Sequence, residues 1–184
     1  LESYDGELQT KLGLKLLMLT FVRTTELRGA EWTEIDWDKA EWRIPASRMK
    51  MKDPHIVPLS TQTLAIFREL QQHNGKWRFV FPQQYKPSKF MSENAMLYAL
   101  YRMGYRSRTT GHGFRATAST VLNENGFPPD HIERQLAHIE RNKVRAAYNH
   151  AQYLPERRKM MQWWADYIDK VASGSNIIQL KQSK

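Results

Sequence analysis

The sequence predicts an α+β domain that is mainly helical and carries one small three-stranded antiparallel sheet. Two observations lead to this prediction. Apolar residues recur at helical spacing over most of the chain, whereas residues 33–59 hold short alternating or β-branched runs separated by turn residues. The chain has 184 residues, 41% of them hydrophobic, so it can bury one sizeable core. We expect one domain over residues 1–172 and a polar tail over residues 173–184.

Leucine spacing, cap residues and stop residues predict the helices. Leucines from Leu8 to Leu27 recur at helical spacing before Gly29, which predicts a helix over residues 7–30. Ser60 is a cap signal for the next helix. Further helices are expected over residues 60–73, 92–103, 113–125, 128–138, 143–150 and 155–171. Residues 74–90 are rich in Gly, Pro, Gln and Lys and are expected to form a loop with a short strand at 79–81.

The charge balance favours an anionic partner. Lys and Arg number 28 and Asp and Glu 19, so the net charge is 28 − 19 = +9. Nucleic acid is the first candidate and an anionic membrane surface the second. No run approaches the roughly 18 apolar residues of a membrane span. The absence of Cys excludes a disulfide framework and a thiolate zinc site, and it fits a reducing compartment. The chain begins with Leu1 rather than Met, so we expect it to be a piece of a longer protein.

Four clusters carry residues suited to chemistry on an anion. In His112-Gly-Phe-Arg115 the two polar side chains share one face at the start of a helix, where the helix terminus also attracts negative charge. Arg23 opens an Arg-x-x-Glu-Leu run, and Lys50 lies in a basic turn between predicted strands. The fourth cluster is Leu-Ala-His138, which Tyr148 follows after ten residues. Each of these residues alone has an ordinary interpretation, such as a surface arginine, a capping histidine or a packing tyrosine.

Together, and in this order, the clusters resemble the tyrosine recombinases, most closely the integrases of temperate phages and genomic islands. Residues 26–36 and 48–60 carry the finer similarity, and the whole resemblance covers about residues 5–170. The resemblance implies an enzyme that cuts and rejoins DNA through a covalent 3′-phosphotyrosine link, and that residues 1–172 are its catalytic domain. It also implies a basic cleft facing DNA, with a separate N-terminal domain that closes around the duplex.

The resemblance assigns two arginines and one tyrosine to the reacting phosphate. Attack on a phosphodiester builds charge on its non-bridging oxygens, and fixed cations aimed at those oxygens lower the barrier. Arg23 and Arg115 are expected to form that clamp because a guanidinium can hold two phosphate oxygens and stays charged. Tyr148 is expected to attack the phosphorus. Its interval from His138 is one residue longer than in many relatives, which leaves Tyr153 as the other candidate.

The resemblance assigns proton transfer to Lys50 and His112 and a supporting role to His138. Lys50 is expected to protonate the leaving 5′ oxygen, with Lys52 as its rival, and His112 to help deprotonate the tyrosine. His138 is expected to hydrogen-bond the phosphate or to brace the nucleophile. No cofactor and no metal are expected, because no step needs one.

The expected partner is double-stranded DNA at attachment sites, with no membrane partner. Arg106, Arg108 and Lys52 are expected to contact DNA phosphates, although a solvated loop also explains the first two. Relatives assemble as tetramers through a C-terminal segment docked on a neighbour, so we expect a homo-tetramer in synapsis and a monomer alone. The Ile177-Ile-Gln-Leu180 patch is the candidate contact. The expected location is the bacterial cytoplasm, with the nucleoid.

Two other functions share parts of this pattern. A type IB topoisomerase-like enzyme uses the same chemistry without exchanging partner strands. A non-catalytic DNA-binding relative would keep the basic surface alone. The complete set of motifs favours a recombinase that integrates or excises a phage or mobile element.

Overall fold

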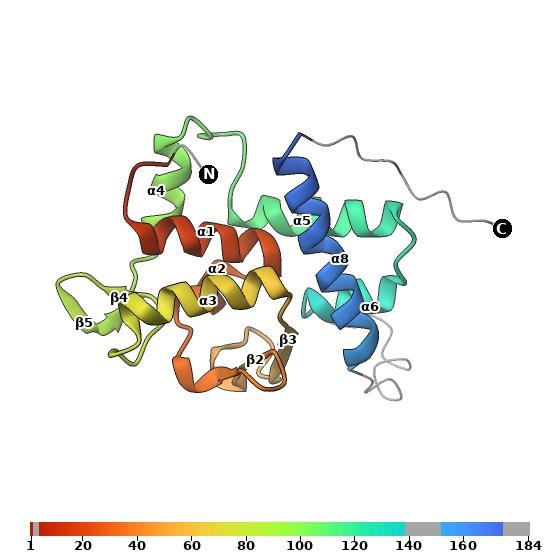
Figure 1. Cartoon of the computed structure of the whole chain (residues 1–184), viewed down its shortest axis with the longest axis horizontal. Helices are drawn as coiled ribbons and strands as arrows, with labels where there is room; N and C mark the ends of the chain where they lie inside the picture. The colour runs from red at the N-terminus through yellow and green to blue at the C-terminus, as the bar shows by residue number, and fades with distance from the viewer. Residues whose placement is uncertain (2–3, 139–151, 175–184) are drawn as a thin grey trace.

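The computed structural model describes residues 1, 4–138 and 152–174, and it is mainly helical with two small sheets (Figure 1). The helices are α1 (Leu8–Thr20), α2 (Thr24–Arg28), α3 (Thr61–Asn74), α4 (Ala95–Arg102), α5 (Gly111–Glu124), α6 (Pro129–Gln135) and α8 (Leu154–Ala172), with short 3-10 helices at Trp32–Glu34 and Ala46–Arg48. The strands are β1 (Ile35–Asp36), β2 (Glu41–Ile44), β3 (His55–Pro58), β4 (Pro82–Gln83) and β5 (Lys86–Phe90).

The three-stranded antiparallel sheet predicted over residues 33–59 is confirmed. Its order is β1-β2-β3, and Trp42 at its centre pairs with Ile35 on one side and Val57 on the other. Trp42 is fully buried and meets Phe67 of α3 edge-on, with 6.0 Å between ring centroids. The sheet is thus fixed against α3, whose N-cap Ser60 accepts a hydrogen bond from the backbone of Thr63 as the cap signal predicted.

The continuous helix predicted over residues 7–30 is wrong, because the chain breaks between α1 and α2. Phe21 adopts a left-handed backbone with φ of 41°. Its ring is fully buried and meets Trp164 of α8 edge-on at 6.2 Å. This packing with the far end of the chain overrides the local helical pattern. As a result Arg23 is not inside a helix but is the N-cap residue of α2.

Three smaller expectations also need correction. Residues 79–81 form no strand apart from an isolated bridge between Phe79 and Glu31, and the antiparallel hairpin β4–β5 follows instead. Helix α4 begins at Ala95 rather than at residue 92, without a side-chain cap. Helix α6 ends at Gln135, so the chain turns before His138. Helices α3, α5 and α8 match their predicted ranges within about two residues. The helix expected over 143–150 and the patch over 177–180 lie outside the described residues.

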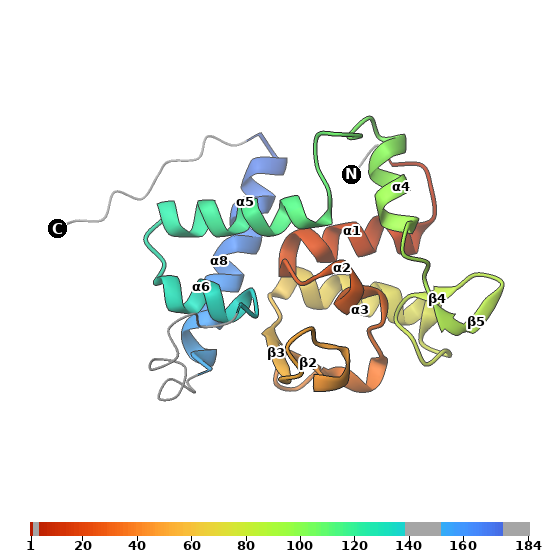
Figure 2. The same ribbon diagram turned by 180° about the vertical axis from the view of Figure 1, so that it is seen from behind.

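The buried apolar residues form two clusters that meet near the end of α1. The larger joins α1, α2, the three-stranded sheet, α3 and α4. The smaller holds Phe21 with the inner faces of α5, α6 and α8. Figures 1 and 2 show these last three helices together on one side of the molecule and the β4–β5 hairpin on the other. Over the described ranges, no helix combines the length and apolar character that crossing a membrane requires.

Candidate active site

Two arginines from different parts of the chain approach the same turn, at the boundary between the two apolar clusters. Arg115 of α5 donates from Nη1 to the carbonyl of Phe21, at 2.5 Å, and from Nη2 to the carbonyl of Leu136, at 2.7 Å. Arg23 donates from Nη2 to the carbonyl of Ala137, at 3.4 Å. Ala137 has a left-handed backbone with φ of 49°, which turns the chain just after α6. The structure therefore brings both expected phosphate-clamp residues to one place.

Glu26 holds Arg23 in position. Its carboxylate accepts from the Arg23 backbone nitrogen, at 2.8 Å, and from Nη1, at 2.6 Å. Glu26 is the third residue of α2, so its carboxylate binds both the backbone and the side chain of the N-cap residue Arg23. Glu26 is buried, whereas a quarter of the Arg23 side chain is exposed. Arg23 is thus oriented from the protein side and open on the other side.

Arg115 is buried, with 4% of its surface exposed. A guanidinium has five N–H groups. Three of them bind Phe21, Leu136 and His138, and those left, on Nε and Nη1, have no partner among the described residues. Burial, and next the charge of Arg23, lower the pKa of Arg115 to about 10, which still leaves it cationic at neutral pH. Two like charges held together in this way form a site that attracts an anion.

His138 follows the turn and contacts Arg115. Its Nε2 atom lies 3.3 Å from Nη2 of Arg115, and its Nδ1 atom lies 2.7 Å from Oε2 of Glu133. A guanidinium only donates, so Nε2 accepts, and the neutral ring carries its proton on Nδ1 and donates it to Glu133. Glu133 thereby orients His138, which in turn braces Arg115.

His112 lies in the first turn of α5, beside the start of α2. The two helix starts approach so closely that a Cβ atom at Gly111 would lie 2.5 Å from Oγ1 of Thr24. A pocket of about 310 Å³ opens there, and His112, Thr24, Thr25 and Arg28 contribute to its lining. His112 is exposed. The residue therefore lies near the Arg23 end of the cluster and is open to a ligand.

Lys50 and Lys52 lie on an exposed turn between β2 and β3. Within the described ranges, neither lysine side chain forms a hydrogen bond or an ion pair. The turn is nevertheless tied to α2, because Arg48 donates to the carbonyl of Glu26, at 2.6 Å, and forms an ion pair with Glu34. Lys50 and Lys52 thus extend from a turn that is anchored to the helix carrying Arg23.

Tyr148, the expected nucleophile, lies outside the described residues. Its rival Tyr153 is the N-cap residue of α8, with a left-handed φ of 49°. The ring of Tyr153 packs on His131 of α6, with 4.8 Å between ring centroids. This contact gives Tyr153 a packing role between α6 and α8.

The loop between α4 and α5 presents two exposed arginines over tyrosine rings. The Arg106 guanidinium lies 5.6 Å from the ring centroid of Tyr101, and that of Arg108 lies 5.9 Å from the centroid of Tyr105. A cation over an aromatic face keeps its outer N–H groups free to donate. The loop leads directly into His112, so these charges lie in sequence next to the cluster.

Two members of the cluster were not assigned from the sequence. Glu26 lies three residues after Arg23 inside the Arg-x-x-Glu-Leu run, and this spacing is the signal that could have revealed it. Glu133 lies five residues before His138, across the end of a helix, where no simple spacing rule applies. Over the described ranges, no three His, Asp or Glu side chains are grouped to hold a metal ion.

Solved structures place the fold in a known class. An integrase from mycobacterium phage Brujita superposes with a TM-score of 0.65 at 14% identity, over 87% of this chain and 53% of that one. The Tn1549 transposon integrase, solved with circular intermediate DNA, superposes with a TM-score of 0.58 at 18% identity, over 86% and 60%. The chain therefore has the catalytic-domain fold of the tyrosine recombinases.

The sequence comparison gives the family. The model of the Phage integrase family matches residues 2–154, so the chain belongs to that family. The integrase of Enterobacteria phage P4 is 49% identical over 92% of this chain, and the prophage integrase IntA of Escherichia coli is 47% identical over 88%. The chain spans about two-fifths of these relatives, 42% and 39% of their lengths. The matched range includes all six expected catalytic positions.

Proposed function

We propose that this chain is the catalytic part of a site-specific DNA recombinase that integrates or excises a phage or mobile element. Cleavage and rejoining would proceed through a 3′-phosphotyrosine formed by Tyr148. One observation carries the proposal: Arg23 and Arg115 converge on the turn at residues 136–138, ten residues before Tyr148 in the sequence. The integrases named above support it as relatives of most of the chain. In this proposal residues 1–172 are the catalytic domain and residues 173–184 a tail.

The scissile phosphate would sit against the two guanidinium groups. The exposed side of Arg23 and the remaining Nη1 N–H of Arg115 can donate to its non-bridging oxygens. Charge grows on these oxygens as the fifth bond to phosphorus forms, and preorganised donors stabilise that charge without rearranging. His138 would contribute by fixing Arg115. This role differs from the two expected from the sequence, which were to hydrogen-bond the phosphate or to brace the nucleophile.

Proton transfers complete the proposed reaction. The Tyr148 oxygen attacks phosphorus and its proton passes to His112, while the bond to the 5′ oxygen breaks and Lys50 protonates that oxygen. In the reverse direction, a 5′ hydroxyl attacks the phosphotyrosine and restores the phosphodiester. The bond energy is stored in the covalent link, so ligation needs no nucleotide.

The proposed partner is duplex DNA at attachment sites. Arg106 and Arg108 would contact phosphates beside the cluster, and Lys52 would do so from the β2–β3 turn, consistent with the net charge of +9. Synapsis would be tetrameric and the free chain monomeric, with residues 177–180 as the candidate intersubunit contact. The proposed location is the host cytoplasm, on the nucleoid.

Covalent trapping on a nicked duplex tests the nucleophile. A nick near the cleavage site lets the short strand diffuse away, so the adduct accumulates. The wild-type chain and the matched control Tyr153→Phe are expected to form it, whereas Tyr148→Phe should bind the same DNA and form none. An adduct with Tyr148→Phe overturns the assignment, and no adduct with the wild-type chain favours a non-catalytic DNA-binding protein. With two different duplexes, joined products indicate a recombinase, and relaxation without joining indicates a topoisomerase-like enzyme.

A further inference from the structure

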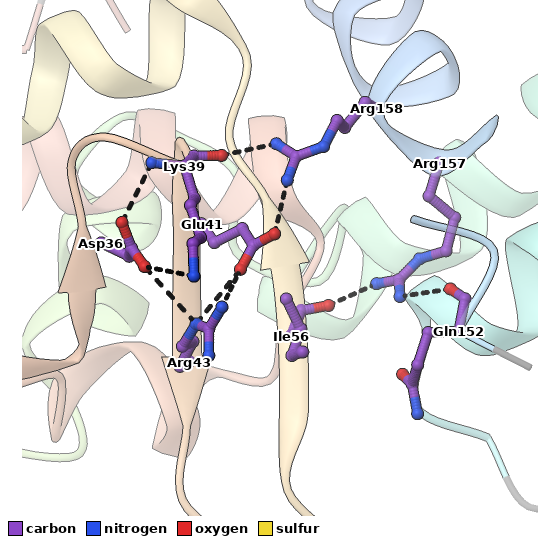
Figure 3. Close-up of polar contacts among 8 residues, drawn as sticks. All are labelled: Asp36, Lys39, Glu41, Arg43, Ile56, Gln152, Arg157 and Arg158. Carbon is purple, nitrogen blue, oxygen red and sulfur yellow. Dashed lines mark hydrogen bonds and ion pairs between the residues drawn. The ribbon is translucent and has the colours of Figure 1, made fainter. Parts of the chain in front are cut away.

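The first turn of α8 contains a buried guanidinium that binds no carboxylate among the described residues. Arg157 is fully buried. It donates from Nη2 to the side-chain oxygen of Gln135, at 2.5 Å. It also donates from Nη2 to the carbonyl of Ile56, at 2.6 Å, and from Nη1 to the carbonyl of Gln152, at 3.1 Å (Figure 3). Burial lowers the pKa of Arg157 to about 9. A buried cation satisfied only by neutral oxygens is costly, so its placement calls for a reason beyond packing.

Two of the hydrogen-bond partners of Arg157, Gln135 and Gln152, stand at the two ends of the segment 135–152. Gln135 is the last residue of α6, and the turn that receives Arg23 and Arg115 follows it directly. Gln152 is the first described residue after position 151, and Arg134 also holds its side chain, at 3.1 Å. Tyr148 lies between these two anchors in the sequence.

Gln135 also forms hydrogen bonds through its side-chain nitrogen and its backbone carbonyl. Its side-chain nitrogen donates to the carbonyl of Thr20, at 3.2 Å, at the end of α1. Its backbone carbonyl lies 3.1 Å from Nε2 of the buried His55, which donates to it from β3. Through Gln135, Arg157 is therefore linked to α1, α6 and the sheet, which surround the arginine cluster.

We propose that Arg157 is a positioning residue for DNA cleavage: with Gln135, it fixes the turn at 136–138 and the chain at residue 152 relative to each other. The reach of Tyr148 toward the phosphate held by Arg23 and Arg115 then depends on this link. The inference rests on the proposed function and adds Arg157 and Gln135 to the residues that the reaction needs. Neither residue touches the reacting atoms in this proposal.

The neighbouring arginine provides a matched control. Arg158 lies on the same helix turn, donates to the carbonyl of Lys39, at 2.6 Å, and forms an ion pair with the buried Glu41 of β2 (Figure 3). It therefore also ties α8 to the three-stranded sheet. It contacts neither Gln135 nor Gln152, so its loss removes a comparable tie but leaves the proposed link intact.

The test measures single-turnover adduct formation on the nicked duplex, at saturating DNA and well below each variant's melting temperature. Arg157→Met and Gln135→Met are expected to slow adduct formation between about 10-fold and 100-fold, because small misplacements have effects of that size. DNA affinity should stay within about twofold. Arg158→Met should cleave within about twofold of wild type. The double variant should be no slower than the slower single variant, since both remove one link.

Several outcomes would overturn the inference. Wild-type cleavage rates in Gln135→Met or Arg157→Met would do so, as would an equal slowing in Arg158→Met. A loss that tracks the unfolded fraction, and that disappears on cooling, would reduce Arg157 to a stability role. If Arg157→Met does not fold, Gln135→Met decides alone. No adduct with the wild-type chain would instead reject the proposed function, which distinguishes the two failures.

Discussion

Arg23 and Arg115 donate hydrogen bonds to the carbonyl oxygens of two consecutive residues, Ala137 and Leu136. The two guanidinium groups are therefore held side by side by the backbone of one turn. Their mutual repulsion is opposed by Glu26 and Glu133, whose charges raise the pKa of Arg115 while burial and Arg23 lower it. The spacing of the charges is thus built into the fold before any phosphate arrives.

The two arginines should respond differently to substitution. Arg115→Met removes the partners of two buried carbonyls, so the free energy of unfolding should fall by about 2 kcal/mol. Arg23→Met alone would leave the buried carboxylate of Glu26 without its ion-pair partner, so this change is measured in a Glu26→Gln background. There it affects only a side chain that is a quarter exposed, so its stability loss should be smaller. Both variants should slow adduct formation by about 100-fold or more, the scale of a lost charge-stabilising donor. Urea unfolding and covalent trapping measure the two effects. Equal stability losses would contradict the structural distinction.

Glu133 should matter through the hydrogen bond that it accepts from His138. Glu133→Gln keeps an oxygen that can accept from Nδ1, whereas Glu133→Leu does not. We expect Glu133→Leu to slow adduct formation by about fivefold, equivalent to about 1 kcal/mol, and Glu133→Gln to stay near wild type. If both variants are slowed alike, the charge of Glu133 matters and not its hydrogen bond.

His55 should make the fold sensitive to acid. Burial, and next the charge of Arg157, lower the pKa of His55 from 6.5 to about 3. The unfolded chain therefore binds one more proton than the folded chain between about pH 3 and pH 6.5. Stability should fall as pH falls through that window, by up to about 1.4 kcal/mol per pH unit from this group. His55→Gln keeps an amide that can donate to Gln135 but cannot titrate. The free energy of unfolding of this variant, measured with urea from pH 7 to pH 4.5, should therefore depend less steeply on pH than that of the wild type. The same slope in both proteins would show that His55 does not contribute.

A substrate whose leaving group needs no proton should identify which lysine is the general acid. A bridging 5′ sulfur leaves without protonation, because a thiol is far more acidic than an alcohol. Lys50→Ala should therefore fail on the ordinary duplex and recover on a 5′-thio duplex, whereas Lys52→Ala should lose mainly DNA affinity. Rescue of Lys52→Ala instead would reverse the assignment between the two lysines.

The arginines of the α4–α5 loop should contribute to the salt dependence of DNA binding. Arg106→Ala and Arg108→Ala should each reduce the slope of log affinity against log salt by about 1. Arg78→Ala is the control, because Arg78 is already paired with Glu31 at 2.8 Å. Fluorescence anisotropy over a range of salt concentrations measures all three. Unchanged slopes for the loop variants would mean that their charges stay solvated in the complex.

The sequence predicted local elements well and long-range contacts poorly. The sheet and the Ser60 cap follow from neighbouring residues, so pattern and turn chemistry were sufficient. The break at Phe21 was missed because its cause is Trp164, which no window around residue 21 contains. The helical leucine spacing there is real and is overridden by packing.

The candidate site shows the same division. Arg23, Arg115 and His138 were recognised from short motifs in a matching order, and the structure brings them to one turn. Arg157 was not recognised, because its hydrogen bond to Ile56 spans 101 positions and no spacing rule connects them. A hydrogen bond from a side chain to a distant backbone carbonyl does not depend on which side chain the accepting residue carries, so only the fold reveals it.

The hydrogen bonds of Arg115 to two backbone carbonyls also predict which residues are kept when a copy of this domain accumulates mutations and loses its activity. Arg115 joins the end of α1 to the turn after α6, so a copy that no longer cuts DNA still needs it to stay folded. A quarter of the Arg23 side chain is exposed, and among the described residues its long-range hydrogen bond is the 3.4 Å contact with Ala137. Drift in an abandoned prophage should therefore erase Arg23 before Arg115. The survival of Arg115 in a decayed relative is then a sign of an intact scaffold rather than of a working enzyme.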